Sequence, residues 1–122
     1  MSKKTVIIGA SPNQARYSFL AAEMLKDHGH EFVPIGMKKG SVLGFDIVNI
    51  RSKPMLRDVD TVTIYIGPSR QPDWYEYILA LKPRRVIFNP GTENQEFENL
   101  VELSGASAIE ACTLVMLRTG QY

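Results

Sequence analysis

A short stretch near the start of the chain carries the residue types that bind phosphate. Gly9, Ala10, Ser11 and Pro12 follow the apolar run 5–8, and a segment with helical spacing begins at about Arg16. The first turn of a helix leaves backbone N–H groups unpaired and carries the positive end of the helix dipole, and small residues let the backbone approach an anion closely. A strand, a turn of small residues and a helix start in this order therefore predict a nucleotide phosphate site.

This turn matches the dinucleotide-binding fingerprint only in part. The fingerprint has glycines at three positions, G-x-G-x-x-G, and this chain has Gly9 followed by Ser11 and Gln14 at the other two. A tight turn between a core strand and a helix uses the same small and polar residues. Ligand binding and a purely structural turn are therefore both open for this loop.

Strands alternate with helices along the whole chain. The runs of β-branched and apolar residues predict strands at 5–8, 31–35, 61–66, 86–88 and 108–109. Apolar residues at helical spacing predict helices at 18–28, 74–81 and 93–103, and a final helical turn from 112 to 117. Glycines at 36, 40 and 44 break the stretch 36–57, which we expect to be a long crossover with room for a short strand at 46–50 and a short helix near 54–57.

Alternating strands and helices predict parallel pairing, because a parallel pair needs a crossover that a helix fills. The expected fold class is α/β: a Rossmann-like sheet of about five parallel strands with helices on both faces, formed by residues 1–122 as a single domain. In such a sheet the ligand binds beyond the carboxyl ends of the strands. The loops expected there are 9–16, 36–39, 67–70 and 89–92, and their small and polar residues suit phosphate and ribose.

Composition narrows the classes of partner. The chain has 122 residues, is 44% hydrophobic and has a formal net charge of +1, which argues against nucleic acid as a partner. Its basic residues form only small clusters at 38–39, 51–53 and 82–85. No run approaches the roughly 18 apolar residues of a membrane span, and no secretory signal is evident. We therefore expect a cytoplasmic protein with no membrane partner, in which the single cysteine, Cys112, is a free thiol.

Several motifs together resemble those of the small CoA-binding domain proteins, which are Rossmann-like and related to the nucleotide-binding domain of the succinyl-CoA synthetase alpha subunit. The resemblance covers nearly the whole chain. It rests on the order and spacing of Gly9-Ala10-Ser11-Pro12 with Arg16 and Ser18, His28-Gly29-His30 before Val33-Pro34-Ile35, Lys38 through Leu43-Gly44, Pro68-Ser69, Asn89-Pro90-Gly91-Thr92-Glu93-Asn94 and Glu110-Ala111-Cys112.

The resemblance implies a small nucleotide-like ligand, coenzyme A or an acyl-CoA. Its pyrophosphate would lie on Ser11 and the backbone from Gly9, with Arg16 as a charged partner and Lys38 near the ribose phosphate or the adenine. The cofactor-binding residues implied in this way are Gly9, Ala10, Ser11, Pro12, Arg16, Ser18, Lys38, Pro68, Ser69, Asn89, Pro90, Gly91 and Thr92.

The chain departs from the family pattern at two places. Gly36-Met37 replaces the Asn-Pro that similar proteins have after the second strand, and the third strand ends at Ile66-Gly67, where a basic residue is common. Arg70 follows one turn later, either as a compensating cation or as a solvated loop charge. These departures affect the contacts expected for adenosine and for phosphate.

The sequence predicts no catalytic group and no metal site. His28 and His30 flank a glycine at a helix end, where capping accounts for them. Cys112 is the one nucleophile to consider: at a helix start its pKa would fall, and it could form a mixed disulfide with the thiol of CoA or hold an acyl group. A small buried packing residue is the other interpretation of this cysteine.

Two alternatives to a CoA-binding module stay open. One is an enzyme that binds NADP or uses an acyl-CoA, and the other is an interaction module without a ligand, with a homodimer compatible with either. An acidic residue after the second strand would indicate NAD, because it would hold the ribose diol. Lys38 stands there instead, and it suits a phosphorylated ribose, which CoA and NADP carry and NAD lacks.

Overall fold

The computed structural model describes residues 2–122, and a six-stranded parallel sheet lies at its centre. The strand order is β5 (Val48–Asn49), β2 (Phe32–Gly36), β1 (Thr5–Ile8), β6 (Thr61–Ile64), β7 (Arg85–Phe88) and β8 (Ser107–Glu110). Strand β1 is central: Thr5 is the register partner of Phe32 on one side and of Thr61 on the other. The predicted Rossmann-like α/β class is confirmed, with one strand more than the five expected.

The additional strand comes from the long crossover after β2. The strand expected at 46–50 forms as β5, which pairs with the end of β2. Just before it, β3 (Ser41–Val42) and β4 (Phe45–Asp46) form an antiparallel hairpin. The helix expected near 54–57 is wrong: the chain forms the 3-10 turn η1 (Ile50–Ser52) instead, and Lys53 ends it with a left-handed backbone at φ 45°.

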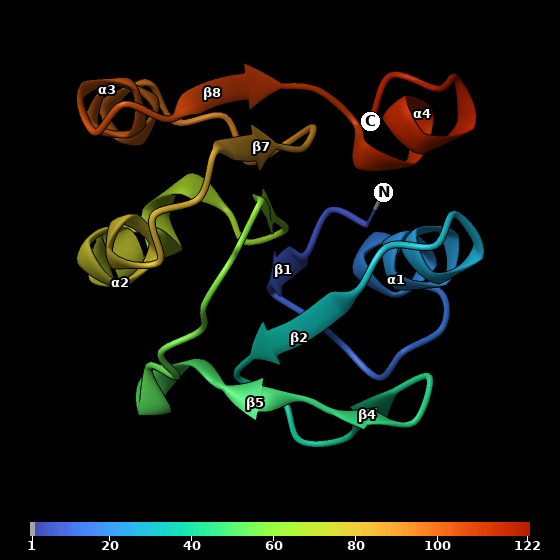
Figure 1. Ribbon diagram of the computed structural model, residues 1–122. Helices are drawn as coiled ribbons and strands as arrows, with labels where there is room; N and C mark the ends of the chain where they lie inside the picture. The colour runs from blue at the N-terminus through green and yellow to red at the C-terminus, as the bar shows by residue number, and fades with distance from the viewer. Residues whose placement is uncertain (1) are drawn as a thin grey trace.

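Helices cover both faces of the sheet, as Figure 1 shows. Helices α1 (Tyr17–Asp27) and α4 (Thr113–Arg118) lie together on one face, at the right of the view, and α2 (Tyr75–Ala80) and α3 (Gln95–Leu103) lie on the other. Side chains alternate across a strand, so Ile7 packs with Phe19 under α1 while Val6 and Ile8 pack toward α2 and α3. Each face of β1 therefore contributes to a separate buried apolar core.

The helices agree with the sequence-based ranges within a few residues. Gly29 at φ 79° ends α1, where the N–H of Gly29 donates to Lys26 and that of His30 to Leu25. The largest difference precedes α2, where two 3-10 turns, η2 (Pro68–Arg70) and η3 (Pro72–Trp74), replace a direct loop. These turns place 68–74 beside the carboxyl end of β6.

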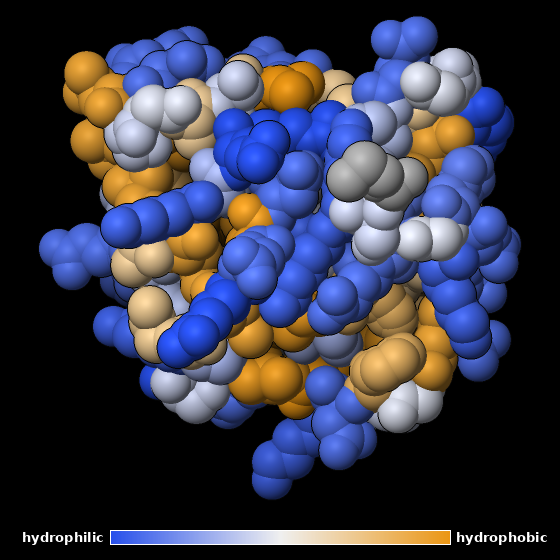
Figure 2. All heavy atoms as spheres, viewed as in Figure 1, coloured by the Kyte–Doolittle hydropathy of each residue, from blue (hydrophilic) through white to orange (hydrophobic). Residues whose placement is uncertain are grey.

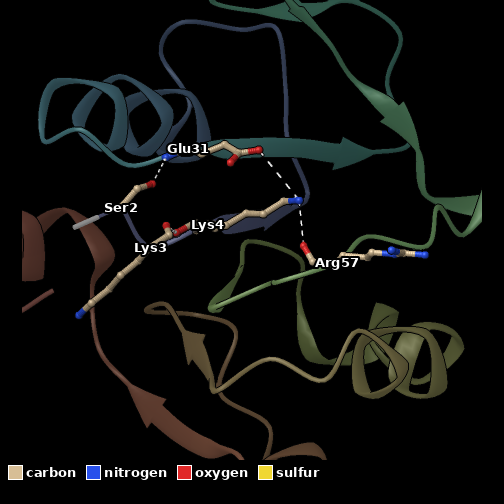
Figure 3. Close-up of polar contacts among 6 residues, drawn as sticks. Ser2, Lys3, Lys4, Glu31 and Arg57 are labelled. Carbon is tan, nitrogen blue, oxygen red and sulfur yellow. Dashed lines mark hydrogen bonds and ion pairs between the residues drawn. The ribbon is translucent and has the colours of Figure 1, made fainter.

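Polar contacts hold the residues before β1 against neighbouring segments at the opposite edge of the sheet (Figure 3). The ammonium group of Lys4 donates to the carbonyl of Arg57 at 2.9 Å and lies 4.0 Å from the carboxylate of Glu31. The hydroxyl of Ser2 accepts from the N–H of Glu31 at 3.0 Å. These contacts connect the chain before β1 to β2 and to the segment before β6.

Tyr122 makes further contacts at the same edge of the sheet. The Tyr122 hydroxyl is hydrogen-bonded to that of Thr5, Lys3 donates to the Tyr122 carbonyl at 2.6 Å, and the Arg85 guanidinium lies 4.2 Å from the centre of the tyrosine ring. Over the face seen in Figure 2, hydrophilic side chains are spread with apolar patches between them. Within residues 2–122, none of the helices has the length and apolar character to cross a bilayer.

Candidate functional site at the carboxyl ends of the strands

A cleft of about 360 Å³ lies where β1, β2 and β6 end. These are three adjacent strands of the sheet, so the loops that follow them meet at one edge, as expected for a parallel sheet. The cleft is lined by Gly9, Ala10, Ser11, Arg16, Tyr17, Ser18, Gly36, Met37, Lys38, Ile50, Tyr65, Ile66, Arg70, Trp74, Pro90 and Thr92.

The turn after β1 is held closely between its two neighbouring strands. Gly9 has a φ of 95°, and a β-carbon there would lie 2.9 Å from Cγ2 of Ile66. On the other side, a β-carbon at Gly36 would lie 2.7 Å from the carbonyl oxygen of Ala10. The N–H groups of Gly9 and Ala10 both donate to the carbonyl of Ile35, at 2.9 and 3.0 Å. Both glycines are therefore needed for close backbone approach, and the first two N–H groups of the turn serve the fold.

The donors that face outward come later in the turn and from the start of α1. Arg16 occupies the N-cap position, where no side chain accepts a hydrogen bond from the helix, and the first turn has no acidic residue. Among residues 2–122, the backbone N–H groups of Ser11, Tyr17 and Ser18 donate to no protein acceptor. All three residues line the cleft. An uncapped helix start with free N–H groups attracts anions through these donors and through the helix dipole.

Local hydrogen bonds hold this loop in place. The Ser11 hydroxyl oxygen accepts from the N–H of Asn13 at 3.1 Å, and the Asn13 side chain accepts from the N–H of Ala15 at 2.9 Å. The carbonyl of Asn13 accepts from the N–H of Arg16. The Ser11 hydroxyl keeps its proton available for a ligand, since its oxygen acts here as an acceptor.

Three cations line the cleft: Arg16, Lys38 and Arg70. Within residues 2–122 the one ion pair is that of Lys4 and Glu31, at the opposite edge of the sheet. The cleft lining contains no aspartate, glutamate, histidine or cysteine. The cleft lining therefore offers positive charge without a neutralising carboxylate, and Arg70, although exposed, is one of its three cations.

Apolar and aromatic groups form the wall beyond the phosphate loop. Ile66 lies two residues after β6, Ile50 begins η1 and Trp74 ends η3. Ile50 is only 2% exposed. Tyr65 also lines the cleft, but its hydroxyl is buried and has no hydrogen-bond partner within the described residues. Burial raises the pKa of Tyr65 to about 12. Tyr65 is therefore neutral near pH 7.

The loop after β7 contributes Pro90 and Thr92 to the cleft, and Asn89 holds that loop in place. Asn89 is 2% exposed; its amide donates to the Thr63 hydroxyl at 2.7 Å and to the Ile64 carbonyl at 2.9 Å, and its oxygen accepts from the N–H of Thr113 at 2.9 Å. The side chain of Asn89 thus connects β7, β6 and the start of α4.

Gln71 is a positioning residue that sequence reasoning missed. It is completely buried, and its amide donates to the carbonyls of Ile66 at 3.0 Å and Thr92 at 2.8 Å, while its oxygen accepts from Asn94 at 2.9 Å. These bonds join the loops after β6 and β7 on the wall of the cleft. In the sequence Gln71 lies between Pro68 and Pro72, and nothing there distinguishes it from a solvated loop residue. The sequence therefore held no signal for this role.

The structure brings most of the residues implied by the resemblance to one place. Those that line the cleft are Gly9, Ala10, Ser11, Arg16, Ser18, Lys38, Pro90 and Thr92. The others lie beside it: Pro12 packs near Gly40, Pro68 begins η2, Ser69 lines a neighbouring groove, Asn89 is buried as described, and Gly91 is exposed in a turn.

Several cleft residues stood outside the implied set. The three-dimensional arrangement of the loops also brings the following residues to the cleft lining: Tyr17, Gly36, Met37, Ile50, Tyr65, Ile66, Arg70 and Trp74. Cys112 is half-buried at the N-cap of α4, outside the cleft lining. No group of three or more histidine, cysteine, aspartate or glutamate side chains within residues 2–122 is arranged to hold a metal ion.

Comparison with known proteins gives one family and a set of similar folds. The family model described as "CoA binding domain" matches residues 3–118. A crystal structure of an uncharacterized protein is 55% identical over 100% of this chain and 99% of its own, with a TM-score of 0.97. No match was found among curated proteins.

More distant structures share the fold alone. A protein from Thermus thermophilus is 20% identical, with a TM-score of 0.82, over 99% of this chain and 91% of its own. A hypothetical protein from Pyrococcus horikoshii OT3 is 22% identical, with a TM-score of 0.83, over 97% of this chain and 83% of its own. The sheet and its helices therefore persist where most side chains differ.

Proposed function

Because the chain belongs to the CoA binding domain family, we propose that it binds coenzyme A or an acyl-CoA in the cleft, as a binding module that does not convert its ligand. The pyrophosphate would lie at the start of α1, where the N–H groups of Ser11, Tyr17 and Ser18 are free of protein acceptors. This row of unpaired donors at an uncapped helix is the observation that carries the proposal. Arg16 and Lys38 would add charge-assisted hydrogen bonds to phosphate.

The composition of the cleft lining supports binding over conversion. Histidine, aspartate and glutamate are common general acid–base groups, and the described cleft lining has none of these; the side chains there that could transfer a proton are those of Lys38 and two tyrosines, Tyr17 and Tyr65. The same composition disfavours NAD, whose ribose diol calls for a carboxylate after the second strand, where Met37 and Lys38 stand. NADP remains the alternative ligand, because its phosphorylated ribose would also suit Lys38.

The test is isothermal titration calorimetry of the purified protein with CoA, acetyl-CoA, NADP and NAD. We expect binding of CoA and acetyl-CoA, weaker binding of NADP and none of NAD. Arg16→Ala should weaken CoA by roughly 1.5–3 kcal/mol, the value of a hydrogen bond to a charged group. Arg84→Ala is the matched control, since Arg84 is exposed in the loop before β7, at the other edge of the sheet.

Each outcome separates the proposal from its alternatives. Preferential binding of NADP would favour the enzyme alternative. Absence of binding by all four compounds would reject the cleft as a nucleotide site and leave the interaction module. Unchanged affinity of Arg16→Ala would remove Arg16 from the phosphate contacts.

A further inference from the structure

A second groove lies beside the cleft and shares part of its lining. The groove has a volume of about 520 Å³, and Met37, Arg70 and Trp74 line both hollows. Beyond them its wall carries Arg51 and Lys53 from the turn η1. With Arg70 they give the groove three cations against one carboxylate, that of Asp73, and none of the four takes part in an ion pair within residues 2–122.

The backbone that carries Arg51 and Lys53 is firmly held. The Asn49 side chain accepts from the N–H of Arg51 at 2.9 Å, and the Ser52 hydroxyl donates to the Asn49 carbonyl at 2.7 Å. Lys53 adopts φ 45°, a conformation that costs free energy in residues other than glycine and persists where the surroundings impose it.

Buried contacts anchor this turn on both sides. Ile50, directly before Arg51, is 2% exposed and belongs to the core. Directly after Lys53, the carbonyl of Pro54 accepts from the Tyr77 hydroxyl at 2.7 Å. The two cations therefore extend from a preformed support, which reduces the ordering cost of binding an anion.

The aromatic ring of Trp74 lies at the junction of the two hollows, since it lines both. A flat, partly buried aromatic side chain is a stacking surface for a purine base. One side of the junction has the helix N–H donors described above, and the other has Arg51 and Lys53. The order along the surface is therefore an anion site, an aromatic surface and a second anion site.

We propose that this groove selects nucleotides whose ribose carries a phosphate separate from the pyrophosphate. In coenzyme A this is the 3′-phosphate of the adenosine half: Arg51 and Lys53 would bind it from the groove, with Lys38 on the side of the adjoining cleft, while the adenine stacks on Trp74. The inference rests on the proposed function, because it takes the pyrophosphate to lie at α1. It adds a specificity determinant that lies outside the phosphate loop.

The experiment compares CoA with dephospho-CoA, which lacks only the 3′-phosphate. Trp74 is the single tryptophan of the chain, so its fluorescence reports occupancy of the junction, and calorimetry supplies the affinities. We expect wild-type protein to bind CoA at least tenfold more tightly than dephospho-CoA. The double variant Arg51→Gln/Lys53→Gln should lose about tenfold in CoA affinity and keep its dephospho-CoA affinity, whereas Arg84→Gln should change neither.

Two results would overturn the inference alone: equal affinities of wild-type protein for CoA and dephospho-CoA, or an equal loss for both ligands in the double variant. Binding of neither ligand by wild-type protein would overturn the proposed function, and this inference with it. Both substituted residues are exposed, and glutamine keeps an unbranched polar side chain without the charge, so thermal unfolding should confirm that the variants fold.

Discussion

Gly9 lies directly against the backbone of Tyr65: a β-carbon at position 9 would come within 3.1 Å of the Tyr65 carbonyl carbon. The contact joins the turn after β1 to the end of β6, the two segments that form the middle of the cleft. Because Gly9 also has φ 95°, both the space and the backbone conformation at this position require glycine.

Gly9→Ala should therefore lower the free energy of unfolding by about 2 kcal/mol or more, which combines left-handed strain of about 1 to 2 kcal/mol with overpacking. Gly44→Ala is the control, since Gly44 has φ 86° but would meet no atom within 4 Å, and about 1 kcal/mol is expected there. Urea unfolding measures the free energy of unfolding of both variants. Equal losses in the two variants would contradict a role for the close approach to β6.

Asn89→Ala should lower the free energy of unfolding by about 2 to 4 kcal/mol, because buried groups on β6 and α4 would lose their hydrogen bonds. Three such bonds depend on the Asn89 side chain. The exposed Asn99, which accepts a single bond from Gln95, provides the matched Asn99→Ala control. Urea unfolding of both variants is the measurement, and a loss of less than about 0.5 kcal/mol at Asn89 would contradict its role as a connector.

Removal of the Tyr77 hydroxyl and removal of the Tyr65 hydroxyl should have different effects on stability. The Tyr77 hydroxyl donates to the Pro54 carbonyl, so Tyr77→Phe should cost about 1 kcal/mol of stability. The Tyr65 hydroxyl is buried without a partner in the described residues, so Tyr65→Phe should leave the stability unchanged or raise it. Thermal unfolding of the two variants provides the comparison, and a clear loss for Tyr65→Phe would indicate that its hydroxyl has a partner, such as an ordered water.

Stability should decline at alkaline pH because of the same two residues. Burial raises the pKa of Tyr65 and that of Tyr77 to about 12, above the ordinary value of 10.0. Below pH 10 both phenols are neutral in the folded and the unfolded chain, and the free energy of unfolding falls as the pH rises toward 12 because the phenols ionise first in the unfolded chain. Urea unfolding between about pH 9 and pH 11 should show a steeper decline for wild-type protein than for Tyr65→Phe/Tyr77→Phe, and parallel curves would rule this cause out.

The sequence was most informative where one periodic signal dominated. The β-branched run around Thr61 and the apolar run before Gly9 predicted buried strands, and the structure has both at the centre of the sheet. It was least informative between β2 and β6, where strands of two residues are too short to show alternation. The helix expected at 54–57 failed there because a turn held by Asn49 and ended by Lys53 determined the local path.

The residues of the cleft also differ in how far the sequence could predict them. Loop residues close to a strand end, such as Ser11 and Lys38, could be assigned to it from the order of elements alone. Trp74 lines the cleft and Gln71 lies next to it because the two 3-10 turns place 68–74 beside β6. No residue pattern in the sequence predicted these turns. For Asn89 the motif implied a ligand contact, and the structure adds a role that the motif did not indicate, since its side chain connects β6, β7 and α4.

The position of β1 in the middle of the sheet has a consequence for synthesis. Among the strands of this sheet β1 is synthesised first, yet its neighbour on one side begins at residue 32 and its neighbour on the other at residue 61. At about 5–20 residues per second, the edge of β1 that pairs with β6 stays without its partner for several seconds. Of the strands that finally pair on both sides, β1 therefore waits longest for its second partner while the protein is being made.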